Sequence, residues 1–77
     1  MDLGVKAGRV RAILDDHVFK DILADCRQDQ IDIFLAPLST DEQIGEARLR
    51  IRAMDDLTDR MQRVLHDAQI AERRTKK

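Results

Sequence analysis

Apolar residues in the second half of the chain recur at alternating steps of three and four positions. Eight residues follow this spacing: Ile44, Ala47, Ile51, Met54, Thr58, Met61, Leu65 and Ala68. On a helix, the spacing aligns them into one seam that faces a partner helix, and Leu57 and Val64 widen that seam on one flank. The pattern predicts a helix over about 41–72. Five seam residues are expected to hold the fold or an oligomer: Ile44, Ile51, Met54, Met61 and Leu65.

Polar residues before this helix provide its start signal. Ser39, Thr40 and Asp41 are all good N-terminal caps. Two capping boxes fit the spacing, one formed by Ser39 with Glu42 and the other by Thr40 with Gln43. The sequence leaves both open.

The first half predicts a second helix, over about 16–35, capped by Asp15 or Asp16. Pro37 ends it, because proline disfavours the helical conformation in the residue before it. Its apolar residues lie on or beside one stripe: Phe19, Ile22, Leu23, Cys26, Ile33 and Phe34. A short connection between two such helices is typical of an antiparallel hairpin.

The two predicted helices differ in length, at about 30 Å and about 48 Å. Paired from the turn, the shorter helix ends opposite about residue 61, which leaves apolar positions such as Val64 and Leu65 bare. Residues 5–14, with Val10, Ile13 and Leu14 at helical spacing, are one candidate cover, and a second copy of the chain is the other. The predicted fold is therefore an all-α single domain, 1–77. It is an antiparallel hairpin with a short N-terminal helix folded against it and a basic tail over 73–77.

Composition narrows the function classes. Cys26 is the single cysteine, so no disulfide forms within one chain. Two phenylalanines and no Trp or Tyr argue against a base-stacking nucleic-acid platform. Residues 1–14 lack an uninterrupted apolar signal segment, and no apolar run approaches the roughly 20 residues that span a bilayer. We expect a protein that is kept in the cytoplasm or carried inside a particle assembled there.

Candidate chemistry is sparse along the chain. Asp55, Asp56 and Asp59 form an acidic group, but no nucleophile or Gly-rich loop accompanies them. We therefore expect a protein without catalytic activity and without a bound metal or cofactor. Gly4 and Gly8 form a GxxxG pattern, which we interpret as the mark of a loose amino terminus.

Thr58 is the polar residue of the seam. It either sets register between helices or bonds back to a carbonyl of its own helix.

Basic residues allow a weak contact with phosphates or an acidic partner. The candidates in the tail are Arg73, Arg74, Lys76 and Lys77. Together with Arg48 and Arg52, the arginines of this tail would serve a nucleic-acid-binding hairpin dimer, whose affinity would fall steeply with salt.

Two stretches carry a family resemblance. "ILDDHVF" (13–19) and "ARLRIRAMDDLTDRMQRVLHDAQIA" (47–71) resemble small all-helical proteins encoded among phage and prophage packaging and structural genes. Those proteins open with an "L-x-D-P-V-F"-like stretch, and this chain has His17 at the proline and Met54 at a seam leucine. The resemblance implies a head-assembly or DNA-packaging accessory that acts through helix–helix contacts with a protein partner or its own copies. An inhibitor that masks a host protein is the remaining alternative.

Overall fold

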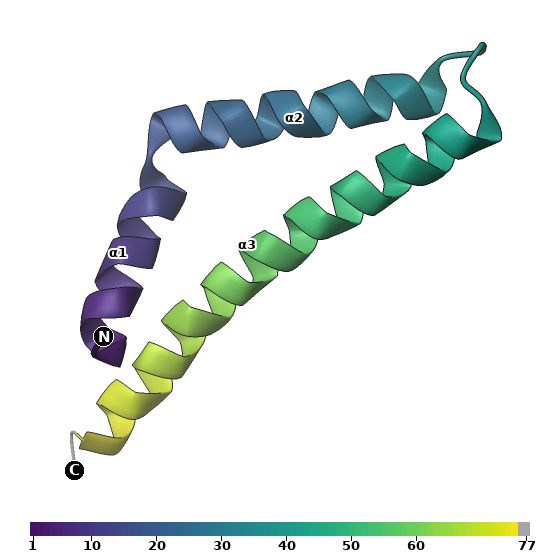
Figure 1. Ribbon diagram of the computed structural model, residues 1–77. Helices are drawn as coiled ribbons and strands as arrows, with labels where there is room; N and C mark the ends of the chain where they lie inside the picture. Colours follow the sequence, from purple (N-terminus) through teal and green to yellow (C-terminus); the bar gives the residue numbers. More distant parts are fainter. Residues whose placement is uncertain (76–77) are drawn as a thin grey trace.

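The computed structural model describes residues 1–75 and is all-helical over that range, which confirms the predicted fold class. Its three helices are α1 (Leu3–Asp15), α2 (His17–Leu35) and α3 (Asp41–Thr75). Figure 1 shows α3 as the long element to which the other two return. Compared with the ranges expected from the sequence, α1 begins two residues earlier and α3 extends three residues further.

Asp16 makes the corner between α1 and α2. Its backbone is extended (φ −69°, ψ 125°), and its Oδ1 accepts a hydrogen bond from the Phe19 N–H at 2.9 Å. Of the two aspartates suggested by the sequence, Asp16 is therefore the cap of α2. Because a single residue separates the helices, the chain changes direction sharply there (Figure 1).

The turn between α2 and α3 uses one of the two candidate capping boxes. The Gln43 N–H donates to Thr40 Oγ1 at 3.1 Å, and the Thr40 N–H donates to Gln43 Oε1 at 2.9 Å. Ser39 has a different function, because its hydroxyl donates to the Ile33 carbonyl at 2.6 Å. The Thr40 box therefore starts α3, while Ser39 ties the turn to the end of α2.

The helices form an elongated, open arrangement of 59 × 22 × 18 Å. α2 and α3 run antiparallel and lie close together at the turn, then splay apart toward the Asp16 corner (Figure 1). α1 comes back from the corner and packs on the C-terminal part of α3. α3 therefore contacts both other helices.

Burial is confined to two alanines in the described part of the chain. Ala47 lies in the half of α3 nearest the turn, and Ala7 lies in α1 where it meets α3. Large side chains near the corner, such as Leu14, Phe19 and Met61, remain half-buried. The apolar interior is thus thin, and it is best packed at its two ends.

The amino terminus is ordered as helix, so the interpretation of Gly4 and Gly8 as a loose end is wrong. Both lie within α1 and neither has a positive φ. Both also line the contact between α1 and α3. An added Cβ would meet nothing within 4 Å at Gly8 and only the Asp2 carboxylate, 3.7 Å away, at Gly4, so the packing of α1 on α3 does not require either glycine.

Candidate interaction surface

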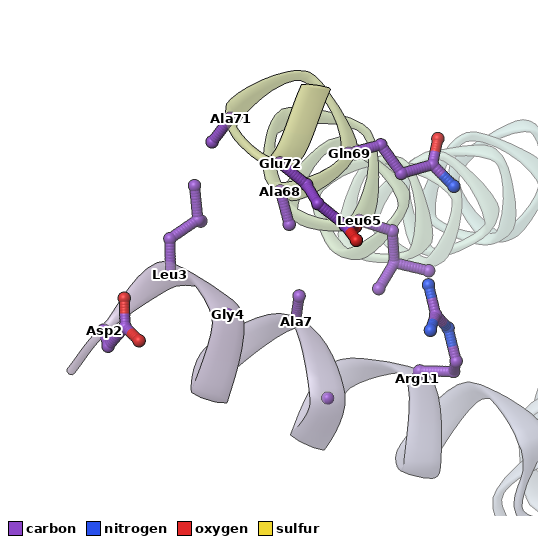
Figure 2. A pocket seen from close by; sticks show the side chains of 11 residues that line it. Asp2, Leu3, Gly4, Ala7, Arg11, Leu65, Ala68, Gln69, Ala71 and Glu72 are labelled. Atoms are coloured by element: carbon purple, nitrogen blue, oxygen red, sulfur yellow. The ribbon is translucent and has the colours of Figure 1, made fainter. Parts of the chain in front are cut away.

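The α1–α3 contact forms a hollow of about 380 Å³ with small apolar walls. In Figure 2, Leu3 and Ala7 point from α1 toward α3, and Leu65 and Ala68 point back. The polar residues that line this hollow are Asp2, Arg11, Gln69 and Glu72. It is a groove of helix packing in which we find no arrangement suited to catalysis.

A second hollow, of about 200 Å³, lies at the turn end of the hairpin between α2 and α3. Its walls are almost entirely apolar, and its lining residues are Ile31, Phe34, Leu35, Arg48 and Ile51. Phe34 and Leu35 are exposed, although the sequence pattern placed Phe34 on or beside the inward stripe of α2. Leu38, in the turn itself, is almost fully exposed.

An ion pair joins the middle of α2 to the middle of α3. Arg27 Nη1 donates to Asp55 Oδ1, and Arg27 Nη2 donates to Asp55 Oδ2 at 3.4 Å. The hydrogen bond from Arg27 holds the pKa of Asp55 below its ordinary value, and Asp55 in turn raises the pKa of Arg27. From the sequence, Asp55 was assigned only to an acidic group, because a partner 28 positions away leaves no local signal.

The five seam residues all occupy α3 and are all half-buried: Ile44, Ile51, Met54, Met61 and Leu65. None is fully covered within the single chain. Thr58, the polar residue of the seam, donates to the carbonyls of Asp55 (3.0 Å) and Met54 (3.2 Å). Of its two possible roles, the structure shows the bond back into its own helix.

The basic candidates are spread along α3. Arg73 and Arg74 are exposed in its last turn, and Lys76 and Lys77 lie outside the described residues. Arg48 and Arg52 are exposed as well, but 21 positions of helix between Arg52 and Arg73 span about 32 Å. These arginines therefore do not form one phosphate-binding patch on a single chain.

No chemical centre emerges from the part of the chain that the structure describes. His17 and His66 are both exposed, and no group of three or more His, Cys, Asp or Glu residues there is placed to hold a metal ion. Asp56 and Asp59 lie beside Arg60 and Arg63, an alternation of charge typical of a solvated helix face. Among residues 1–75, no helix has the length and apolarity needed to cross a membrane.

Comparison with family models, curated proteins and solved structures finds no significant match to this chain. The class that the structure defines is a small all-helical protein. Its distinguishing feature is the apolar surface left open on its helices.

Proposed function

We propose that the chain is a non-enzymatic interaction protein that works through helix–helix contacts. The observation that carries the proposal is the large accessible surface area of the folded chain. A folded monomer of 8.9 kDa is expected to expose about 4,800 Å². This chain exposes 6430 Å², with large apolar side chains uncovered on all three helices. Surfaces of that kind mark sites of protein association.

The resemblance of residues 13–71 to small helical proteins of phage packaging and structural genes supplies a setting for this activity. In that setting the protein is a head-assembly or DNA-packaging accessory, in the host cytoplasm or in the phage particle. Its working form is the α2–α3 hairpin with α1 folded against α3. The neighbourhood of its gene separates this function from that of an inhibitor, because an assembly accessory belongs among portal, terminase and capsid genes.

Dye fluorescence, mass in solution and DNA binding test the proposal. Folded protein should enhance the fluorescence of 1-anilinonaphthalene-8-sulfonate, or else show a mass above 8.9 kDa, because its apolar faces are either open or covered by a partner. A cooperatively melting monomer that leaves the dye dark would contradict an interaction function. Tight, salt-sensitive binding to double-stranded DNA would instead favour the nucleic-acid-binding dimer.

A further inference from the structure

We propose that a second copy of this chain docks on one apolar face of the hairpin, which we name the Ile22 face. It comprises Val18, Ile22 and Ile33 of α2 with Leu57 and Val64 of α3. The inference rests on the proposed function and specifies both its surface and its partner.

The Arg27–Asp55 pair is a reference point for comparing positions along α2 with positions along α3. Because α2 and α3 are antiparallel, Ile22, five positions before Arg27, lies level with residue 60, five positions after Asp55. By the same count, Val18 lies level with Val64. The α2 and α3 members of the Ile22 face near the corner therefore lie at matching positions along the two helices, which splay apart there.

The residues that line two hollows near the turn show that the α2 and α3 members of the Ile22 face lie on the same side of the hairpin. Ile33 and Arg50 line one hollow, whereas Ile31 and Arg48 line another. Two helical positions turn the chain by about 200°, so the two hollows open on opposite sides of the hairpin. From Ile33, steps of four, three and four positions lead along the same side of α2 to Ile22.

On α3, steps of seven lead from Arg50 to Leu57 and then to Val64, again along one side of the helix. The exposed fractions show that this side is uncovered near the corner: 65% for Val18, 58% for Ile22 and 52% for Leu57. Helix α1 does not cover them, although it packs on the C-terminal part of α3.

The amount of excess surface fits a second copy. The chain exposes about 1,600 Å² more than a monomer of its mass should. Two chains that each lost this excess would bury about 3,200 Å² in total, within the range of permanent homodimers. The surplus, counted over the whole chain, is large enough to supply the area that a stable dimer needs.

Charge favours the same partner, because the chain carries both signs at the edges of the face. Asp29 lies seven positions after Ile22 on the same side of α2. Arg50 lies seven before Leu57 on the same side of α3, where its exposed guanidinium is 3.9 Å from Glu46 of the same helix. A twofold axis parallel to the helices sets α2 of one protomer against α3 of its partner, which brings Asp29 toward the partner's α3 side. The alternative, α2 against α2, would bring together the exposed Asp25 and Asp29 of each copy, which lie near Ile22 around the helix.

Light scattering on wild-type and substituted chains tests this assignment. Wild type should have twice the 8.9 kDa chain mass, and the double variant Ile22→Glu, Leu57→Glu should have the single-chain mass with its helical circular dichroism retained. Both side chains are more than half exposed, so the substitutions place charge at the proposed interface without burying it inside a single chain. The control is Leu49→Glu on the same helix, because Leu49 is 64% exposed and is turned by about 100° from Arg50, its neighbour on the side of the Ile22 face.

Cys26 provides a readout that needs no substitution. It is exposed on α2, one turn from Ile22, and should react severalfold more slowly with iodoacetamide at concentrations where the mass doubles. An unchanged reaction rate in the dimer, or a dimer lost equally in Leu49→Glu, would overturn the choice of face. A wild-type chain that is monomeric at every concentration would overturn the proposal that a second copy docks on the Ile22 face. If that monomer still enhances the fluorescence of 1-anilinonaphthalene-8-sulfonate, the proposed interaction function stands.

Discussion

Arg27 and Asp55 form an exposed ion pair between residues 28 positions apart in the sequence. Each residue lies near the middle of its helix, and the pair is consistent with the antiparallel register of α2 against α3. Local contacts such as the Asp16 and Thr40 caps could be predicted from the sequence, because both partners lie within three positions. The Arg27–Asp55 pair could not, since its partners meet only after the chain has folded back.

The Arg27–Asp55 pair predicts a pH dependence at the residue scale. Because the folded-state pKa of Asp55 lies below the ordinary 3.8, the carboxylate stabilises the fold fully above that pH. The contribution is lost as pH falls below 3.8 and through the folded-state pKa. Asp55→Asn should therefore lower the unfolding midpoint at pH 7 by a small amount and flatten its dependence on pH below 3.8.

Thermal melts across a pH series measure this effect, with Asp56→Asn as the control. That substitution removes the same charge one position along α3, where no hydrogen bond to Arg27 is formed. Identical melting curves for the two variants would show that the ion pair does not stabilise the contact.

The side-chain amide of Gln30 gives a second prediction at the residue scale. Its Oε1 is buried without a hydrogen-bond partner within the described residues. A buried acceptor that lacks a donor costs about 1–3 kcal/mol, so Gln30→Met, which keeps the length and removes the acceptor, should raise the free energy of unfolding by about 1 kcal/mol. Urea titration measures this change, and a loss of stability would indicate that the amide is engaged.

At the scale of elements, the sequence predicted where helices begin and end better than how they meet. The apolar spacing and Pro37 define α2 and α3, because both signals are local. The angle between helices is set elsewhere, by the extended backbone of Asp16 and the small residues of the α1–α3 contact. Two residues assigned on or beside one stripe of α2 are exposed: Ile22 lies toward the corner, where α2 and α3 splay apart, and Phe34 lines the hollow at the turn end.

The start of α3 gives a prediction that separates the two capping boxes. Thr40→Ala removes the acceptor for the Gln43 N–H and should cost about 1 kcal/mol of unfolding free energy. Glu42→Ala, the partner in the unused box, should cost only the few tenths of a kcal/mol that a charge at a helix start contributes. Urea titration of both variants checks the order, and a larger loss for Glu42→Ala would reverse the assignment.

The seam of α3 gives another prediction at this scale. Ile51 is half-buried and lies in the apolar hollow with Phe34, so Ile51→Asp places a charge where the two helices meet. The variant should lose about 2 kcal/mol or more, and with it the fold or the oligomer. Leu49→Asp, on the exposed side, should be tolerated. An Ile51→Asp chain with wild-type melting temperature and wild-type mass would show that the seam holds neither.

At the scale of the whole molecule, both the shape and the exposed surface indicate an open arrangement of helices with little interior. The radius of gyration is 16.9 Å, compared with about 11–12 Å for a compact chain of this length. Among the residues whose burial the structure describes, only Ala7 and Ala47 are buried, so little apolar surface offsets the conformational entropy lost on folding. The sequence predicted apolar positions in need of cover, but the splay between α2 and α3 decides which positions those are.

The most direct test of this account is the unfolding midpoint of the wild-type chain measured over a wide range of protein concentration. If association completes the fold, the midpoint rises with concentration, because mass action favours the assembled state. A midpoint that stays constant, with a mass of 8.9 kDa throughout, would show that a single chain is stable with its apolar surface open and would contradict the account.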